Sequence, residues 1–255
     1  MPTVTSNAAE SNRRPIFVVG APRSGTSMLH WALVQHANLW GSAESDFLSP
    51  LIEGVDAAYA KGTEFGEYHW LNKEEVTKSE FFRQIGKAID SLYLSRSGNL
   101  RWVDQTPHYI LYYDRLRTML PGAKFIHIVR DGRQVICSMQ EKFGWSFLQS
   151  TRMWKQLVEA GEAISRQARD DFLQVSYESV VQNPEQSFRQ IYRFIEEEYD
   201  PNSVGFLEKP INTSPGRESE DSADKLIPRW RDWKPQKRII FQAYCGKLNR
   251  SLGYQ

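Results

Sequence analysis

"FVVGAPRSGTS", residues 17–27, joins an apolar, β-branched run to a turn that contains two glycines. The run is typical of a buried parallel strand, and the spacing of Leu29 and Leu33 predicts a helix from Thr26. A helix that begins directly after a tight turn presents amide groups without intrahelical partners, and its dipole is positive at that end. The stretch therefore predicts a strand, an anion-binding loop and a helix in direct succession.

The loop departs from the usual nucleotide-binding pattern at one position. Gly20 and Gly25 have the spacing of that pattern, but Thr26 stands where it has lysine. Arg23 supplies a fixed charge, and three hydroxyl groups can donate hydrogen bonds, those of Ser24, Thr26 and Ser27. A nucleoside triphosphate is normally neutralised by the lysine and by Mg²⁺. A 5′-phosphosulfate fits better, because its sulfuryl group carries one negative charge and needs no metal. The alternative is that the glycines serve only a strand-to-helix turn.

The composition is that of an ordinary globular protein. The chain has 255 residues, of which 25% are charged and 40% hydrophobic, and its net charge is +1. This balance disfavours a surface built for nucleic acid or for an anionic membrane. The two cysteines, Cys137 and Cys245, have no metal-binding spacing, so no metal site is expected. Neither a signal peptide nor a membrane-spanning segment is recognisable, and a cytoplasmic location is expected.

Strands and helices alternate along the rest of the chain. Strand patterns occur within residues 100–107, 125–129 and 171–181, and helical patterns separate them. This alternation predicts a single α/β domain over residues 15–255, in which helices flank a central parallel sheet that carries the P-loop-like phosphosulfate-binding loop. Residues 1–14 are polar and are expected to form a disordered tail.

Local patterns refine this outline. Residues 50–70 are rich in glycine and aromatics without clear periodicity, which predicts a long loop or lid. Asn72 and Glu75 resemble a capping box that opens a helix. The expected buried face of that helix consists of Phe81, Ile85, Ile89 and Leu92. Residues 209–225 are polar and turn-forming, hence a loop, and residues 235–252 predict a closing helix.

A second basic cluster follows the strand at residues 125–129. Arg130 comes directly after this strand, at the carboxyl edge of the sheet, where open α/β folds bind ligands. Ser138 and Lys142 are four residues apart and share a helix face. These three side chains can therefore converge on one further phosphate. The alternative is that Arg130 pairs with Asp131 or with a neighbouring carboxylate, and that Ser138 and Lys142 are ordinary surface residues.

These two motifs and four further stretches follow an order that resembles the sulfotransferase family. The stretches are "FVVGAPRSGTS", "WVDQTPHY", "PGAKFIHIVRDGRQVICSM", "VSYESVVQNPEQSFRQI", "RWRDW" and the final "LGY". The resemblance covers residues 15–253. It is nearest to the branch that contains tyrosylprotein sulfotransferases and many bacterial small-molecule sulfotransferases. It implies a transferase whose donor is 3′-phosphoadenosine-5′-phosphosulfate (PAPS), with adenosine 3′,5′-bisphosphate (PAP) as a product.

The resemblance also implies which residues hold the donor. Residues 23–27 (Arg23, Ser24, Gly25, Thr26 and Ser27) correspond to the 5′-phosphosulfate loop. The cluster of Arg130, Ser138 and Lys142 corresponds to the 3′-phosphate site, and Tyr177 to a contact on the adenine side. Ser222 and Arg229 correspond to a segment that closes over the donor, with Ser222 also a catalytic candidate. Lys225 and Arg231 are alternatives to Arg229.

Sulfuryl transfer needs a base for the acceptor proton and charge near the leaving phosphate. Glu44 lies 21 residues after Arg23, where the nearest branch of the family has its carboxylate base. His108 is the rival, since a neutral histidine is a natural base near pH 7. Related sequences often have lysine before the "TP" turn, whereas this chain has Gln105, which carries no charge. Arg23 would then bear more of the leaving-group stabilisation, or Lys225 could contribute.

The acceptor is expected between Glu44 and the residues after it. Aromatic side chains could line its pocket: Trp40, Phe47, Tyr59, Phe65, Tyr68, His69, Trp70 and Trp145. Such a lining favours a small or lipid-like alcohol, or an amine, as acceptor. The alternative is that these aromatics pack a lid onto the core. The oligomeric state stays open, with a homodimer among the options.

Two other functions compete with this hypothesis. One is a P-loop kinase or nucleotide hydrolase in which Asp131 holds Mg²⁺, although the loop lysine is missing. The other is a non-catalytic nucleotide-binding protein that keeps the fold, for which Gln105 is slight support.

Overall fold

The structure is a computed structural model that describes residues 14–167, 169–208 and 229–255. The predicted tail lies, except for Arg14, outside the described residues. The predicted loop at 209–225, with Ser222 and Lys225, also lies outside them.

In the described residues, five strands form one parallel sheet in the order β2-β3-β1-β4-β5. The strands are β1 (Ile16–Gly20), β2 (Leu39–Gly41), β3 (Arg101–Asp104), β4 (Lys124–Val129) and β5 (Phe172–Ser176). The central strand β1 pairs with β3 on one side and β4 on the other, so that Ile16 lies between Val103 and Lys124. The predicted α/β fold with a central parallel sheet is confirmed.

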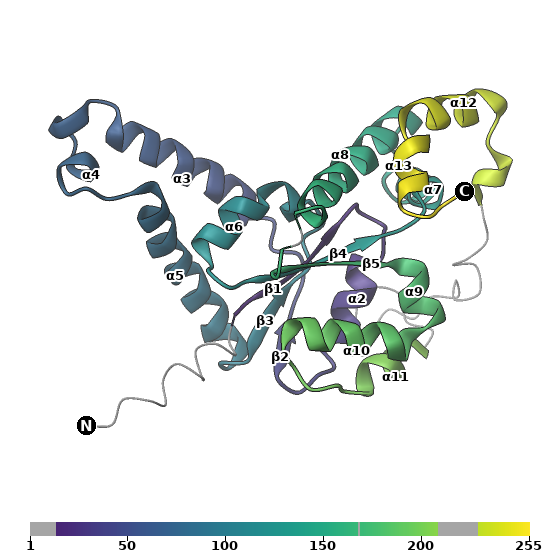
Figure 1. Cartoon of the computed structure of the whole chain (residues 1–255), viewed down its shortest axis with the longest axis horizontal. Coiled ribbons are helices and arrows are strands. Elements are labelled where there is room, and N and C mark those ends of the chain that lie inside the picture. Colours follow the sequence, from purple (N-terminus) through teal and green to yellow (C-terminus); the bar gives the residue numbers. More distant parts are fainter. Residues whose placement is uncertain (1–13, 168, 209–228) are drawn as a thin grey trace.

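One face of the sheet is covered by helices that follow β1 and β5 (Figure 1). They are α2 (Thr26–Leu33), α9 (Tyr177–Gln182), α10 (Pro184–Ile195) and α11 (Asn202–Glu208). Ile16, Val18 and Ile126 point to this face and are fully buried. Alternate residues of a strand point to opposite faces, so Phe17, Val19 and Phe125 face the other layer.

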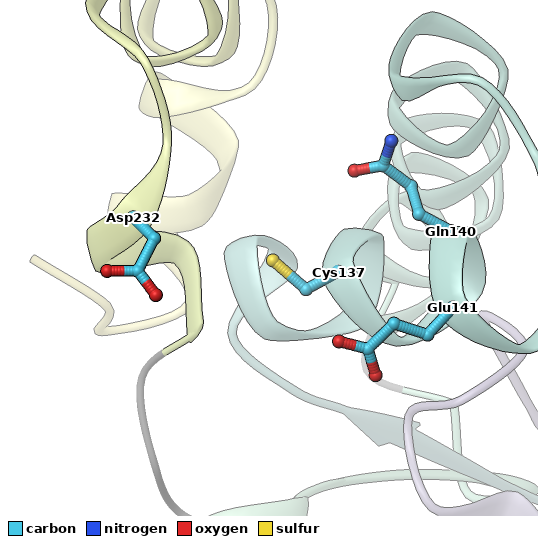
Figure 2. Close-up of a pocket in the computed structure, with 4 residues that line it drawn as sticks. All are labelled: Cys137, Gln140, Glu141 and Asp232. Atoms are coloured by element: carbon cyan, nitrogen blue, oxygen red, sulfur yellow. The ribbon is translucent and has the colours of Figure 1, made fainter.

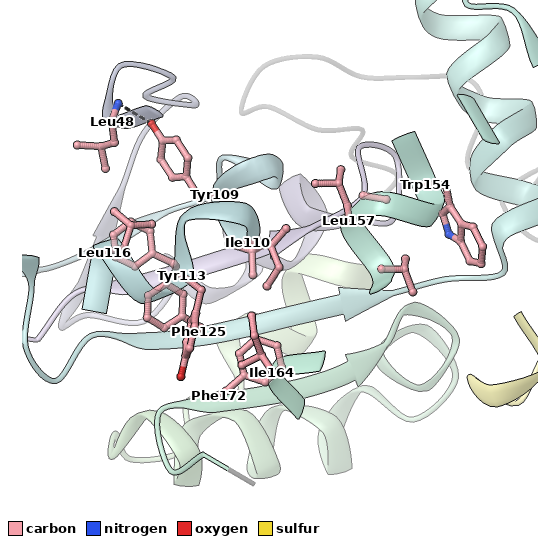
Figure 3. Close-up of a cluster of buried hydrophobic side chains, with 14 of the residues drawn as sticks. Leu48, Tyr109, Ile110, Tyr113, Leu116, Phe125, Trp154, Leu157, Ile164 and Phe172 are labelled. Atoms are coloured by element: carbon pink, nitrogen blue, oxygen red, sulfur yellow. Dashed lines mark hydrogen bonds between the residues drawn. The ribbon is translucent and has the colours of Figure 1, made fainter. Parts of the chain in front are cut away.

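The second layer contains a larger apolar cluster (Figure 3). It is covered by α3 (Leu48–Thr63), α5 (Lys78–Ser97), η2 (Pro107–Tyr112), α6 (Tyr113–Met119), α7 (Gly132–Phe143), α8 (Phe147–Ser165) and α12 (Pro235–Tyr244). Phe17 and Phe125 stack with ring centroids 5.1 Å apart. Trp154 of α8 is fully buried, and Gly132 opens α7 against it, because a Cβ at Gly132 would lie 2.6 Å from the indole.

The prediction of a loop or lid at residues 50–70 is wrong. Residues 48–63 form α3, whose Leu48, Ile52 and Val55 have helical spacing and are buried. Gly54 and Gly62 obscured this pattern, yet a helix tolerates isolated glycines at a modest loss of stability. Helices α3 and α5, with η1 (Gly66–Tyr68) and α4 (Trp70–Lys73) between them, form an arm that projects from the sheet (Figure 1).

The predicted capping box at Asn72 is also wrong. Helix α5 begins at Lys78, and its cap is Thr77, whose Oγ1 accepts a hydrogen bond from Glu80 N at 3.2 Å. The Asn72 side chain donates instead to the carbonyl groups of Thr63 and Gly66, each at 2.9 Å. The buried face of α5 includes Ile89 as predicted, but centres on Phe82 and Gly86, and Leu92 is exposed.

Three further boundaries differ from the predictions. The strand predicted within 171–181 ends at Ser176, because the Ser176 hydroxyl caps α9 by accepting from Ser179 N at 3.1 Å. The closing helix is interrupted at the buried Cys245, which divides it into α12 and α13 (Gly246–Ser251). Strand β2 and helix α11 were not predicted. No helix in the described ranges is long and apolar enough to span a membrane.

Candidate active site

The chemistry-bearing residues lie where the parallel strands end. The loop of residues 20–27 follows β1, Glu44 follows β2, Gln105 and His108 follow β3, Arg130 follows β4, and Tyr177 follows β5. Because all five strands run in the same direction, these ends share one edge of the sheet. The fold therefore brings together residues that are far apart in the sequence, such as Arg23 and Tyr177, which are separated by 154 positions.

The loop after β1 needs its glycines for space as well as for conformation. Gly20 has φ +152°, and a Cβ there would lie 2.5 Å from the Ile128 carbonyl oxygen. Gly25, the residue before α2, has φ +105°, and a Cβ there would lie 2.6 Å from Cδ2 of Tyr177. Arg23 adopts φ +71°, an uncommon backbone conformation for a residue with a side chain. Such strain is concentrated at functional sites.

The loop contacts the second basic cluster directly. Arg23 Nε donates to Ser138 Oγ at 3.1 Å, across 115 residues. Arg130 Nη1 donates to the Arg23 carbonyl oxygen at 3.4 Å, and its guanidinium carbon lies 4.0 Å from the centroid of the Tyr177 ring. Burial, reinforced by Arg130, lowers the pKa of Arg23. Two cations held this close favour an anionic ligand between them.

The alternative pairing of Arg130 with Asp131 is wrong. The Asp131 carboxylate accepts from Arg133 instead, through Nε at 2.9 Å and Nη2 at 2.7 Å. The Arg130 guanidinium stacks on the ring of Tyr177. Lys142 lies one turn beyond Ser138 on α7 and is exposed. Within the described residues it forms no hydrogen bond with Arg23, Arg130 or Ser138. Its convergence on the same phosphate stays a prediction.

Two buried polar atoms at this edge have no hydrogen-bond partner among the described residues. They are the hydroxyl of Ser24, which is fully buried, and Oε1 of Gln105, which is 4% exposed. Leaving such a group without a partner costs about 1–3 kcal/mol, so its presence suits a polar ligand. The oxygens of a sulfuryl group and its bridging phosphate can accept from the Ser24 hydroxyl. Gln105 Oε1 can only accept, so of this side chain only the amide Nε2 could donate to such a group. The loop and its surroundings therefore fit a phosphosulfate.

Glu44 lies among carboxylates on the segment after β2. The residue is exposed, but partial desolvation of its carboxyl group, together with Asp46 and Asp104, raises its pKa. Asp104 is buried at the end of β3 and accepts from Tyr93 Oη at 2.9 Å and from Thr106 N at 2.8 Å. A carboxyl group with a raised pKa is suited to proton transfer.

His108 lies close to the same segment. Its Nε2 is 2.8 Å from Ser49 Oγ, and its Nδ1 is 3.9 Å from Asp46 Oδ1. The Glu44 segment is tied to the start of η2 by Ser45 N, which donates to Thr106 Oγ1 at 3.1 Å. Glu44 and His108, the two candidate bases, therefore lie on neighbouring segments. The His108 ring already contacts Ser49 through Nε2.

The predicted aromatic lining is partly wrong. Residues 65–70, which lead into α4, lie at the outer end of the arm, and Tyr68 is 95% exposed there (Figure 1). Tyr59 donates to the Val76 carbonyl oxygen within the arm. Phe47 does lie near the site, where it stacks on Tyr93 at a centroid distance of 6.3 Å. Sequence reasoning missed Tyr93, although its spacing from Phe82 and Ile89 on α5 was a signal.

Trp40 and Trp145 are half-buried against the larger apolar cluster. Trp40 lies on β2 and Trp145 follows α7, and their place in the acceptor lining stays a prediction.

An open cavity of about 430 Å³ lies between α7 and η4 (Arg229–Asp232). Its lining residues, drawn in Figure 2, are Cys137, Gln140, Glu141 and Asp232. The carboxylate of Glu141 acts electrostatically on Arg23, so the cavity is near the loop. Sequence reasoning missed this lining, although Cys137 and Glu141 share a face of the helix that carries Ser138. Arg229 begins η4 at the rim of this region.

No cluster of three or more His, Cys, Asp or Glu with metal-binding geometry occurs within the described ranges. Asp131, the metal ligand of the competing kinase hypothesis, is occupied by Arg133 and by Asn249, whose Nδ2 lies 3.3 Å from Asp131 Oδ1.

A parallel α/β sheet with a glycine loop, a second basic cluster at its carboxyl edge and no lysine in the loop is the arrangement expected of a phosphosulfate-binding protein. The chain belongs to the sulfotransferase family, whose model matches residues 15–201. The resemblance found in the sequence is confirmed. With it comes the expectation of a sulfotransferase whose donor is PAPS.

Relatives and solved structures agree with this assignment. The chain is 24% identical to protein-tyrosine sulfotransferase A of Caenorhabditis elegans, with 94% of this chain and 67% of that protein covered. The sulfotransferase domain of the Synechococcus PCC 7002 olefin synthase has a similar fold, with a TM-score of 0.64, 19% identity and 94% of each chain covered. A mouse sulfotransferase complexed with PAP matches with a TM-score of 0.57 and 14% identity, covering 98% of this chain and 93% of that one.

The chain spans only 31%, 66%, 44% and 67% of the length of four curated relatives that it matches.

Proposed function

We propose that this chain transfers the sulfuryl group of PAPS to a hydroxyl or amine of a small or lipid-like acceptor by in-line displacement, with Glu44 as the base. The observation that carries the proposal is the contact of Arg23 with Ser138 and Arg130 around the glycine loop. Next to this contact, the buried Ser24 hydroxyl lacks a partner among the described residues. Both features suit an anionic, hydrogen-bond-accepting donor.

The donor side of the site divides between two basic groups. Arg23, Ser24, Gly25, Thr26 and Ser27 would hold the 5′-phosphosulfate. Arg130, Ser138 and Lys142 would hold the 3′-phosphate, and Tyr177 would lie on the adenine side. Arg229 is a further candidate at η4, and Ser222 lies outside the described residues. A similarly folded mouse sulfotransferase is complexed with PAP, which supports PAP as a ligand of this fold.

When bound, PAPS supplies an electrophilic sulfur and a phosphate leaving group. Arg23 would neutralise charge at the leaving phosphate, because its guanidinium is held in place by the hydrogen bond from its Nε to Ser138 Oγ at 3.1 Å. Gln105 offers a dipole where related chains often have a cation, so Arg23 carries more of this stabilisation. Such preorganised charge accounts for a large part of the rate in group-transfer enzymes.

On the acceptor side, Glu44 removes the proton. Desolvation and the neighbouring Asp46 and Asp104 raise its pKa, which makes its ionised form a stronger base. His108 is the second candidate, but its Nε2 is already 2.8 Å from Ser49 Oγ.

The side chains around Glu44 favour an apolar or aromatic acceptor. Phe47 is 39% exposed and stacks on Tyr93, which leaves an apolar face near the base. Several relatives are named protein-tyrosine sulfotransferases, and their acceptor is by name a phenol. An alcohol or phenol attached to an apolar body is therefore the acceptor class that we propose.

Isothermal titration calorimetry with PAP, and separately with ATP and Mg²⁺, tests the donor. We expect PAP to bind without added metal and ATP to bind more weakly, because the loop has no lysine. If the chain binds ATP more tightly than PAP, and binds it only when Mg²⁺ is present, the proposal is wrong. A screen of metabolite extracts with labelled PAPS then identifies the acceptor.

A further inference from the structure

The segment that follows α12 forms hydrogen bonds with the residues directly after β4, although the two segments are more than 100 positions apart in the sequence. Asn249 of α13 is buried, and its Oδ1 accepts from Gly132 N at 2.8 Å. Its Nδ2 lies 3.3 Å from Asp131 Oδ1. One amide side chain therefore satisfies both the first amide of α7 and the carboxylate that caps this helix.

Tyr254 makes the second connection. Its hydroxyl donates to Glu178 Oε2, while Glu178 Oε1 accepts from Asp131 N at 3.4 Å. Burial and the Glu178 carboxylate raise the pKa of Tyr254, so its hydroxyl stays protonated and can donate. Gly253, with φ +92°, turns the chain so that Tyr254 reaches Glu178, and Tyr254 N donates back to Asn249 O at 3.1 Å. We call Asp131, Glu178, Asn249 and Tyr254 the α13 clamp.

The clamp residues are the covalent neighbours of the proposed 3′-phosphate and adenine contacts. Arg130 precedes Asp131, and Tyr177 precedes Glu178. The Arg130 guanidinium carbon lies 4.0 Å from the centroid of the Tyr177 ring, and a Cβ on Gly25 would lie 2.6 Å from Cδ2 of the same ring. Shifting the peptide at Asp131 or at Glu178 moves one member of this stacked pair relative to the other.

We infer that Asn249 and Tyr254 are positioning residues that set the geometry of the Arg130–Tyr177 pair for the 3′-phosphate of the donor. This inference rests on the proposed function, because it takes the donor to be PAPS. Neither residue needs to touch the nucleotide. They act through hydrogen bonds to Gly132 N, Asp131 and Glu178, which hold the ends of β4 and β5 in register at the edge of the sheet.

Tyr254→Phe tests the inference, since it removes one hydroxyl and keeps the ring. PAP and adenosine 5′-monophosphate (AMP) serve as probes, because only PAP has the 3′-phosphate. We expect the Kd for PAP to rise roughly fivefold and the Kd for AMP to change about twofold or less, as one charge-assisted hydrogen bond is lost. The ratio of the two affinities falls. With saturating donor, kcat stays near that of the wild type, because the acceptor side is untouched.

Tyr244→Phe is the matched control. Tyr244 lies on α12, is 60% exposed, and its hydroxyl has no hydrogen bond to the described residues. Gly253→Ala is the second variant, because it strains the turn that delivers Tyr254 while open space surrounds the new methyl group. It should lower the PAP-to-AMP affinity ratio in the same direction.

The outcomes separate the two claims. A ratio that is unchanged in both variants, even with a lower unfolding temperature, overturns the inference, because the clamp would then be structural only. A wild-type chain with no preference for PAP over AMP overturns the proposed donor site itself.

Discussion

Glu44 and the carboxylates of Asp46 and Asp104 lie close enough together to repel one another. The protein tolerates this repulsion at the edge of the sheet, where Tyr93 and Thr106 each donate a hydrogen bond to Asp104. Partial desolvation of Glu44, together with the charges of Asp46 and Asp104, raises the pKa of Glu44. A residue whose ionised form is destabilised by its surroundings takes up a proton readily, as a general base must.

Glu44→Gln separates catalysis from folding at this residue. We expect kcat to fall by roughly 10²–10⁴-fold, the usual contribution of a positioned base, while the Kd for PAP stays near that of the wild type. Transfer of labelled sulfate and calorimetry with PAP measure the two quantities. His108→Ala is the comparison: if it abolishes transfer while Glu44→Gln remains active, then His108 is the base.

As pH rises, kcat/KM is expected to increase, whereas the contribution of Glu44 to the free energy of unfolding is expected to decrease. Because transfer needs the Glu44 carboxylate, kcat/KM should rise with pH through its raised pKa and level off above it. The raised pKa also means that the folded chain binds this proton more tightly than the unfolded chain. The stability from this group is therefore fully present below the unfolded pKa and is lost as pH rises through the folded pKa. Glu44→Gln should consequently unfold at an equal or higher temperature than the wild type at neutral pH. A clearly lower unfolding temperature would contradict this account.

The loop between β1 and α2 depends on close contact with β4 and α9. Gly20 lies against the Ile128 carbonyl oxygen and Gly25 against Tyr177, so the loop has no room for larger residues. The same contact brings the amides at the start of α2 near the Arg130–Tyr177 pair. The glycines therefore form the anion site and also allow it to join the second basic cluster.

Gly25→Ala should damage the donor site more than the fold. The new methyl group would lie 2.6 Å from Tyr177 Cδ2, and φ +105° is strained for any residue with a side chain. We expect the Kd for PAP to rise roughly tenfold or more, because strain of this kind is worth about 1–3 kcal/mol. Isothermal titration calorimetry measures the Kd for PAP. Gly54→Ala on α3, where a Cβ meets nothing within 4 Å, is the control and should leave PAP binding unchanged.

Sequence reasoning succeeded where the decisive interactions are local. The β1 strand, the glycine turn and α2 follow one another directly, and Ser138 and Lys142 lie on the predicted helix after Arg130. It failed at α3, where Gly54 and Gly62 obscured the helical spacing of the buried Leu48, Ile52 and Val55. The bond between Asn249 and Asp131 spans 118 residues, and no spacing rule could have found it. Tyr93 likewise reaches Asp104 only after α5 packs beside β3.

The candidate donor site contains residues from both helical layers. Helices α2 and α9 belong to one face of the sheet, and α7, which carries Ser138, belongs to the other. Arg23 joins the two by donating to Ser138. A ligand held by the loop, by Arg130 and by Ser138 would therefore link both layers through the strand ends.

Such a ligand should stabilise the molecule as a unit. At a concentration 100-fold above its Kd, PAP adds about 2.7 kcal/mol to the free energy of unfolding, which for a chain of this size raises the unfolding temperature by roughly 5–10 °C. Differential scanning calorimetry should show one transition that moves upward as PAP increases. Ser138→Ala removes the hydroxyl that accepts from Arg23 and is the matched variant. Its transition should move less at the same PAP concentration, since its Kd is higher. If the wild-type transition splits in two as PAP is added, the ligand stabilises only one layer, and the site does not join them.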